Sequence, residues 1–371
     1  MADLPTLFTE FLSNIRPQEH HIEDYKRGHK GLREKLKEDE SVSDIYVADF
    51  LQGSYKRSTA VKPRGDEKSD VDIVFVTNIE RGTNPGDALD QCVPFLQNHY
   101  DDNEWEENDR SFKIERGNVE IDLVLTATPT EGAESAVKAM GAFEVEENLG
   151  IENKSVLSEA LGMNGKDGGD QWKDEPLRIP DRRLQKWEET HPLKTLEFTS
   201  KKNGRTDGYY VNVVKAIKWW RRTKTPDVDG PSSYPLEHLV GECCPDTSDS
   251  VAEGVTKTLE GIRDNYRSHA DRNQSPQLAA HGLAHVDVFD RIEGDEFAEF
   301  HSSVVDAAEI ARTAYDEENK SKSQDGWSKL FGDEFPAYDG SDSDSEGGKA
   351  VSFSSTESTE VSEQEFAWNT N

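Results

Sequence analysis

Residues 53–77 read GSYKRSTAVKPRGDEKSDVDIVFVT, and residues 118–126 read NVEIDLVLT. Asp70 and Asp72 open the apolar run of the first stretch, and Asp122 lies inside the apolar run of the second. In a β-strand, residues i and i+2 point to the same face, so Asp70 and Asp72 project together. If the two strands are neighbours, Asp122 adds a third carboxylate, and acids this close repel one another unless cations neutralise them. Hard oxygen ligands suit Mg²⁺, so the two stretches predict a site for two Mg²⁺ ions above a nucleoside triphosphate.

Gly53 and Ser54 supply a second part of this site, a turn that can grip phosphate. Glycine lets the backbone approach a ligand closely, and backbone N–H groups together with the Ser54 hydroxyl can donate to phosphate oxygens. In nucleotidyl transfer, two metals about 3.5–4 Å apart stabilise the attacking and the leaving oxygens of an in-line displacement. We expect Asp70 and Asp72 to bridge both metals, and Asp122 to complete the site of the metal that activates the attacking hydroxyl.

Glu120 is an alternative third acid, because it shares a strand face with Asp122. An acid in the middle of the run IDLVL is costlier to leave without a partner than an acid at the edge of the strand. We therefore choose Asp122, which is also the best candidate for assisting deprotonation of the acceptor hydroxyl.

The composition of the chain indicates a folded, strongly acidic protein. The 371 residues leave room for two domains, with a net charge of −32 and 33% hydrophobic residues. The apolar residues fall in clear runs, which favours a folded protein over a disordered acidic one. A surface this acidic is tolerated in molar salt, where the screening length falls to about 3 Å. We therefore predict a halophilic source, specifically a haloarchaeal one.

Cysteine usage and apolar runs indicate the compartment. Cys92, Cys243 and Cys244 form no CxxC pair, which fits a reducing environment. The first residues lack the basic start and apolar core of a signal peptide, and no apolar run has the length of a membrane span. We expect a cytoplasmic protein without a membrane contact.

The periodicity of apolar residues predicts an α/β chain with its strands in the first half. Strands are expected over 45–51, 72–76, 112–115 and 119–125, and helices over 5–39, 85–99, 209–222, from 234, over 251–270 and over 295–315. Residues 145–175 are polar and glycine-rich but lack the GxxxxGK[ST] pattern, so we expect a mobile loop. From residue 317 the chain turns to Ser, Asp, Gly and Glu. That composition cannot offset the entropy of ordering, which predicts a disordered tail.

The order of these motifs resembles that of the cGAS/DncV-like (SMODS-type) nucleotidyltransferases, relatives of the oligoadenylate synthases within the polymerase-β superfamily. The family pattern appears here as Gly53-Ser54, Arg57-Ser58-Thr59, Asp70-Val71-Asp72, Asp122 to Pro129, Trp187 to Pro192, Lys218-Trp219 and Ser233 to Glu237. Ser58 departs from the pattern, which often has glycine there.

The resemblance implies a bilobed α/β fold, with a polymerase-β-like core, a mixed sheet and a helical C-terminal lobe. The core with its N-terminal helices would cover residues 1–205, the helical nucleotide-binding lobe residues 206–316, and the acidic tail residues 317–371.

The resemblance also implies roles for three residues beyond the acids. Lys218 would contact the donor triphosphate, Tyr234 would stack on its base, and Ser233 would lie beside Tyr234. The residues alone leave alternatives open, which are a solvated helix charge for Lys218 and an ordinary core aromatic for Tyr234.

The implied activity is the joining of ATP, GTP or both into a cyclic di- or trinucleotide, with release of pyrophosphate and two Mg²⁺ or Mn²⁺ ions per site. The product would serve an antiphage (CBASS) system, in which a downstream effector binds it. The acidic tail is a possible point of action for a regulatory protein.

Two other functions compete with this one. A CCA-adding or other tRNA nucleotidyltransferase shares the acids, but it needs a basic path for RNA, and the acidity of the chain argues against a nucleic-acid substrate. A non-catalytic nucleotide sensor has no need for three mutually repelling carboxylates.

Overall fold

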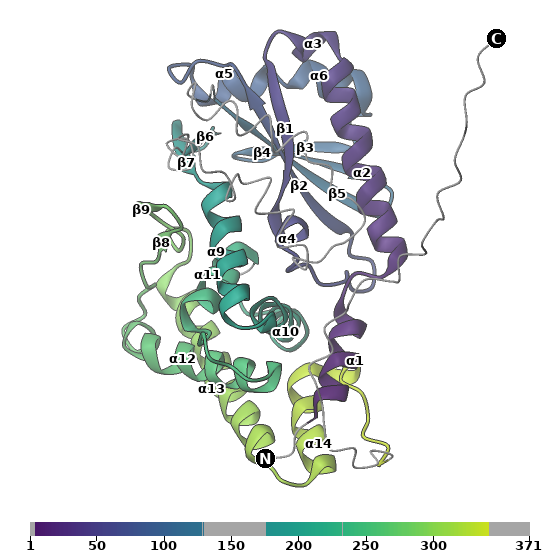
Figure 1. Cartoon of the computed structure of the whole chain (residues 1–371). Coiled ribbons are helices and arrows are strands. Elements are labelled where there is room, and N and C mark those ends of the chain that lie inside the picture. Colours follow the sequence, from purple (N-terminus) through teal and green to yellow (C-terminus); the bar gives the residue numbers. More distant parts are fainter. Residues whose placement is uncertain (1–3, 128, 130–175, 232, 341–371) are drawn as a thin grey trace, which may run out of the picture. The chain divides into compact units, whose positions relative to one another are not determined.

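A five-stranded sheet lies at the centre of the first half of the chain, with the strand order β1-β2-β5-β4-β3 (Figure 1). The computed structural model describes residues 4–127, 129, 176–231 and 233–340. The strands are β1 (Tyr46–Gln52), β2 (Ser69–Thr77), β3 (Trp105–Glu107), β4 (Ser111–Arg116) and β5 (Val119–Thr126). β2 and β5 pair in parallel, while β1 with β2, β4 with β5 and β3 with β4 pair antiparallel. The mixed sheet confirms the α/β fold expected from the sequence.

Alternation along the strands gives the sheet two different faces. Val71, Ile73 and Phe75 of β2 have no solvent exposure. Their face packs with the helices α2 (Glu19–Glu38), α3 (Glu40–Ser43), α5 (Pro85–Asp90) and α6 (Val93–His99). The residues between them, Asp70 and Asp72, therefore point to the second face.

The second face carries a smaller apolar cluster at one end. Phe50, Val74 and Val76 pack there with Leu177, the first residue of β6 (Leu177–Asp181), which pairs with β7 (Lys186–Thr190). The acids of β2 and β5 lie at the other end of this face, where β1 leads into the one-turn helix α4 (Gly53–Lys56).

The second half of the described chain is helical and has its own core. Its elements are α9 (Pro192–Arg205), α10 (Tyr209–Lys224), α11 (Ser233–Cys243), α12 (Val251–Ala270), the short hairpin β8 (Ala279–Ala280) and β9 (Leu283–Asp287), α13 (Gly294–Asp316), α14 (Lys320–Phe331) and the 3₁₀-helix η2 (Gly332–Glu334). Apolar residues occupy most sides of α10, and Val213, Val214 and Ile217 are at most 1% exposed. A helix that is apolar nearly all round is a buried one, so α10 is the centre of this core.

The helix α1 (Pro5–Ile15) packs with the helical core and not with the sheet, although the sequence analysis grouped it with the sheet. Phe8 and Phe11 belong to the helical core, and Phe11 stacks on Phe331 with 4.4 Å between ring centroids. The predicted division at residues 205 and 206 stays a prediction.

The expectation of disorder from residue 317 is wrong for residues 320–331, which form α14. Trp327, Leu330 and Phe331 are each 1% exposed, and their spacing of three and four residues places them on one helical face. Averaging over the acidic composition that follows hid this short apolar stripe. The remaining predicted tail residues 341–371, and the predicted loop at 145–175, lie outside the described residues.

Among the described helices, none combines the length and apolarity that a membrane crossing needs.

Candidate active site

The pairing of β2 with β5 brings the predicted acids onto neighbouring strands. Asp72 lies directly opposite Asp122, and Asp70 lies opposite Glu120, in the parallel register of the two strands. Because the side chains of positions i and i+2 share a face, all four carboxylates project from one small area of the sheet. The predicted juxtaposition of Asp70, Asp72 and Asp122 is therefore present.

Gly53 fits this area because it has no side chain. Its backbone is left-handed, with φ +77°, and a Cβ at this position would overlap the carboxylate of Asp72. Ser54 follows in the first turn of α4. Ser58 occupies the position where the family often has glycine, and it adopts the left-handed φ of +58°. The turn therefore has the backbone conformation that favours glycine although the residue is serine.

The acids raise one another's pKa values. Enclosure by protein, followed by the charges of Asp72 and Asp122, raises the pKa of Asp70 to about 7. Enclosure and the charges of Asp72 and Glu120 raise the pKa of Asp122 to about 6. Burial likewise raises the pKa of Asp72, although the nearby Arg57 opposes this effect. Ionising all of these carboxylates is unfavourable unless a positive charge neutralises them, so the site is suited to bind cations.

Glu237 of α11 holds two cations in the buried space between the sheet and the helices. Its carboxylate accepts a hydrogen bond of 2.9 Å from Arg57 Nε and another of 2.9 Å from Lys218 Nζ. Burial alone would raise the pKa of Glu237, but Arg57 and Lys218 outweigh it and lower the pKa to about 2. Lys218 is thus a buried, paired cation rather than a solvated helix charge.

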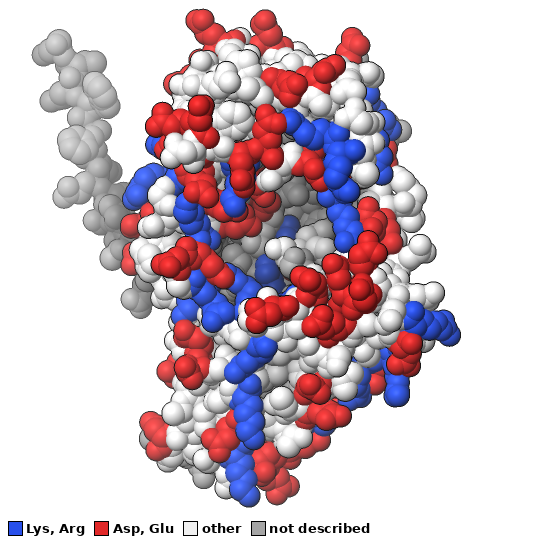
Figure 2. Space-filling model, turned by 180° about the vertical axis from the view of Figure 1, so that it is seen from behind, with Lys and Arg blue, Asp and Glu red and all other residues white. Residues whose placement is uncertain are grey.

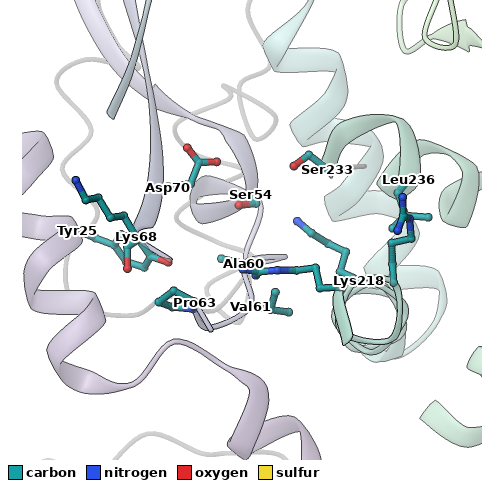
Figure 3. Close-up of a pocket in the computed structure, with 13 residues that line it drawn as sticks. Tyr25, Ser54, Ala60, Val61, Pro63, Lys68, Asp70, Lys218, Ser233 and Leu236 are labelled. Carbon is teal, nitrogen blue, oxygen red and sulfur yellow. The ribbon is translucent and has the colours of Figure 1, made fainter. Parts of the chain in front are cut away.

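A cavity of about 220 Å³ lies beside this group. It is bordered by residues of α2, α4, the loop and strand from Ala60 to Asp70, α10 and α11: Tyr25, Ser54, Ala60, Val61, Pro63, Lys68, Ser69, Asp70, Lys218, Arg221, Arg222, Ser233 and Leu236. In Figure 3, Asp70 and Lys68 lie on one side of the cavity, Lys218 and Ser233 lie on the other, and Ser54 lies between them. Four of the predicted site residues therefore meet at one cavity.

The cavity is basic although the chain is strongly acidic. Figure 2 shows a hollow with Lys and Arg side chains inside it and Asp and Glu side chains along much of its rim. Lys68, Lys218, Arg221 and Arg222 border the cavity, against the single carboxylate of Asp70. Lys68, Lys218 and Arg222 also pair with Glu115, Glu237 and Glu67, which do not border the cavity. The basic groups that border the cavity suit a polyanionic ligand such as a triphosphate.

Tyr234 lies next to this cavity rather than among the residues that border it. Its hydroxyl is 3.5 Å from Thr195 Oγ1, and the guanidinium of Arg57 lies 5.7 Å from its ring centroid. The ring is half-buried, and its stacking on a base stays a prediction.

The side chains of Asp70, Asp72 and Asp122 fit a hard divalent cation in their chemistry, and they lie on neighbouring strands. Carboxylates are the ligands that Mg²⁺ takes from proteins, and Asp72 and Asp122 are direct strand neighbours. Within the described ranges, no group of three or more His, Cys, Asp or Glu side chains is already drawn together in coordinating positions. The Asp72 carboxylate lies instead against Gly53.

Comparison with known proteins identifies the chain. Residues 3–134 match the model of the Second Messenger Oligonucleotide or Dinucleotide Synthetase domain. The chain is 38% identical over 352 residues to a cyclic AMP-AMP-GMP synthase of Enterobacter hormaechei subsp. hoffmannii, covering 90% of this chain and 92% of that protein. The chain belongs to the cGAS/DncV-like nucleotidyltransferases.

Other members of the cGAS/DncV-like family agree with this assignment. A cyclic AMP-AMP-AMP synthase of Acinetobacter is 29% identical over 334 residues, covering 89% of this chain and 84% of that protein. The solved structure of the Bradyrhizobium diazoefficiens CD-NTase CdnG in complex with GTP has a TM-score of 0.63 at 12% identity and covers 89% of this chain and 96% of its own. At that identity the likeness speaks for the fold alone, which is the polymerase-β-like fold that the sequence predicted.

As a cGAS/DncV-like nucleotidyltransferase, the protein is an enzyme that joins nucleoside triphosphates into a cyclic oligonucleotide. Membership in the family also implies dependence on a divalent metal ion in general.

Sequence reasoning missed the role of Arg57 and Glu237. Arg57 is 6% exposed and paired with Glu237. Both residues lie within quoted family motifs, but nothing in either motif indicates that the two form a pair.

Proposed function

We propose that this enzyme joins three nucleoside triphosphates, two of adenine and one of guanine, into a cyclic trinucleotide. The observation that carries the proposal is the identity of 38% to a cyclic AMP-AMP-GMP synthase over 90% of this chain. Asp72 and Asp122 lie opposite each other on neighbouring strands, and each joining step needs such a pair of acids, which also supports the proposal.

In this proposal Asp70, Asp72 and Asp122 hold two Mg²⁺ ions, or Mn²⁺ in their place. The bound ions neutralise the charge that develops on the attacking and leaving oxygens. Asp122 lies on the side of the acceptor hydroxyl and takes part in removing its proton.

The donor triphosphate is assigned to the basic cavity. Gly53 lets the chain approach the phosphates, and Ser54 donates its hydroxyl to them. Lys218 supplies a positive charge that is already held in place by Glu237. Ser233 lies across the cavity from Asp70, and Tyr234, the next residue, stacks on the base.

The proposal also covers the compartment, the biological role and the partners of the enzyme. The cytoplasm supplies the nucleoside triphosphates, the product serves antiphage defence, and an effector protein binds that product. A regulatory protein acting on the acidic C-terminal residues would control the synthesis.

We also propose that the protein works in molar salt, in the cell of a halophilic archaeon. A net charge of −32 on 371 residues supports this, because molar salt screens self-repulsion. Unfolding followed by circular dichroism should show greater stability in 3 M KCl than in 0.1 M KCl. Equal stability in the two salts would contradict the proposal.

The proposed reaction is tested with labelled ATP and GTP, Mg²⁺ or Mn²⁺ and no RNA, in high salt. The expected product resists phosphatase, contains adenine and guanine in a ratio of two to one, and is absent with the variant Asp70→Asn/Asp72→Asn. A product of adenine alone would correct the base composition and leave the cyclase in place. Labelling that requires added tRNA would instead favour a tRNA nucleotidyltransferase, and nucleotide binding without any product would favour a sensor.

A further inference from the structure

A row of polar residues crosses the whole sheet at the level of the proposed metal-binding acids. In strand order the residues that lie opposite one another are Gln52, Asp72, Asp122, Lys113 and Glu106. Opposed residues on paired strands point to the same face. The row therefore continues past the acids onto β4 and β3, where the sequence analysis assigned no function.

Lys113 is the cation of this row and the direct neighbour of Asp122 across β4 and β5. Its Nζ lies 2.7 Å from Glu120 Oε2 and 3.6 Å from Glu106 Oε1, and its side chain is 25% exposed. The hydrogen bond to Glu120 raises the pKa of Lys113. The ammonium is thus held charged beside the acids, and it keeps a path to solvent.

The direction of the reaction places the acceptor nucleotide over Lys113. The phosphate-binding residues Gly53 and Ser54 follow β1, on one side of the acids. In phosphoryl and nucleotidyl transfer, the attacking and leaving oxygens lie roughly in line on opposite sides of the phosphorus. If the pyrophosphate leaves on the β1 side, the acceptor hydroxyl arrives from the opposite side, over β5 and β4.

Every acceptor in the proposed reaction carries a phosphoryl group on its 5′ oxygen. In the first joining step this group belongs to the triphosphate of the acceptor, and in later steps it is the phosphodiester of the linear intermediate. A lysine ammonium is a compact point charge that suits such a group, and a phosphate near several carboxylates needs a cation.

We infer that Lys113 binds the 5′-phosphoryl group of the acceptor nucleotide and so orients the attacking hydroxyl toward Asp122. The inference rests on the proposed placement of donor and metals, and it assigns to β4 a part of the acceptor site.

Two other arrangements have to be separated from this one. Lys113 could serve only to neutralise Glu120, its partner at 2.7 Å. Alternatively, the acceptor phosphate could lie over the cavity, where Lys68 pairs with Glu115 and borders the space beside Asp70.

The experiment isolates a single joining step. The donor is 2′,3′-dideoxy-ATP or 2′,3′-dideoxy-GTP, which has no hydroxyl with which to act as acceptor, and the acceptors are adenosine and AMP, or guanosine and GMP. The measured quantity is the ratio of kcat/KM for the nucleotide acceptor to kcat/KM for the nucleoside. Hydrogen bonds to charged groups are each worth a factor of about ten to a hundred, so the wild type should prefer the nucleotide by about that factor.

Lys113→Gln should bring this ratio close to one while changing the rate with the nucleoside little, and Lys113→Arg should keep most of the preference. Lys257→Gln is the matched control, because Lys257 is also paired with a glutamate but lies on α12. A loss of stability in Lys113→Gln would lower both rates together and leave the ratio unchanged.

Several results would overturn the inference. One is a wild type that uses nucleoside and nucleotide acceptors equally well. Another is recovery of the nucleotide preference in Lys113→Gln/Glu120→Gln, which would make Lys113 a neutraliser of Glu120. A third is loss of the preference in Lys68→Gln but not in Lys113→Gln. If the wild type forms no product from ATP and GTP at all, the proposed function itself fails, which is a separate result.

Discussion

Replacing Glu237 by glutamine tests the buried group that links α4 to α10 and α11. The variant keeps the size of the side chain but removes the charge that pairs with Arg57 and Lys218. The neighbours lower the pKa of Glu237 from its ordinary value of 4.5 to about 2. At about 1.4 kcal/mol per pKa unit, the carboxylate contributes about 3–4 kcal/mol to the free energy of unfolding.

The sign of this contribution fixes its pH dependence. The pKa of Glu237 is lower in the folded protein than in the unfolded chain, so its contribution is complete above pH 4.5 and is lost as the pH falls toward 2. The loss in Glu237→Gln should therefore be smaller at pH 3 than at pH 5, and at pH 5 it should lie between about 2 and 4 kcal/mol because two buried cations lose their partner.

The assay is urea unfolding followed by circular dichroism, at fixed KCl and at both pH values. The matched control is Glu197→Gln, which removes a half-buried glutamate paired with Lys201 in α9 and should cost less than about 1 kcal/mol. Equal losses for the two variants would refute the account of Glu237. A Glu237→Gln effect as large at pH 3 as at pH 5 would refute the pKa argument.

Three further predictions concern the acids and the turn that faces them. Asp122→Asn should abolish product formation yet raise the free energy of unfolding in EDTA at pH 8 by about 1–3 kcal/mol. The reason is that the pKa of Asp122 is raised to about 6, so its ionisation costs stability as the pH rises through 6. Added Mg²⁺ should narrow this gain, and no gain at pH 8 over pH 4.5 would contradict the argument. Gly53→Ala should eliminate the product and destabilise the fold by about 1–2 kcal/mol or more, since φ is +77° and a Cβ would overlap Asp72. Thermal unfolding would show the loss of stability and nucleotide assays the loss of product. An active variant would disprove the tight contact between Gly53 and Asp72. Ser58→Gly should raise the free energy of unfolding by up to about 1 kcal/mol with unchanged activity, because Ser58 has φ +58°. A lower unfolding temperature would contradict this, because it would show that the serine side chain stabilises the fold by more than its backbone strain costs.

The sheet and its acids could be predicted from the sequence because their signals are local. The alternation in Ser69–Thr77 and Val119–Thr126 determines which side chains share a face, and the mid-strand place of Asp122 distinguishes it from Glu120. In the structure Glu120 has Lys113 as a partner, and the choice of Asp122 as the third acid stays a prediction. The strands expected over 112–115 and 119–125 are present as the antiparallel pair β4 and β5.

The pairs between distant segments could not be predicted in this way. Arg57 and Glu237 are 180 residues apart, and no periodicity tells which buried carboxylate a given guanidinium will reach. The same limit applies to β8 and β9, which are too short to show alternation, and to α14, whose apolar stripe is brief. The family resemblance supplied the order of the motifs but not the contacts that join them.

The packing of α1 against α14 has a consequence for how the enzyme is made. Phe8 lies 4.9 Å from Trp327 between ring centroids, and Asn14 donates to the carbonyl of Glu334. On a growing chain, the apolar side of α1 therefore stays exposed until a segment 320 residues further along has been made. Closing so long a loop is slow, and the core that carries Lys218 and Ser233 stays incomplete until then. A nascent chain should thus form its sheet early and gain the capacity to synthesise a signal only after α14 and η2 have been translated.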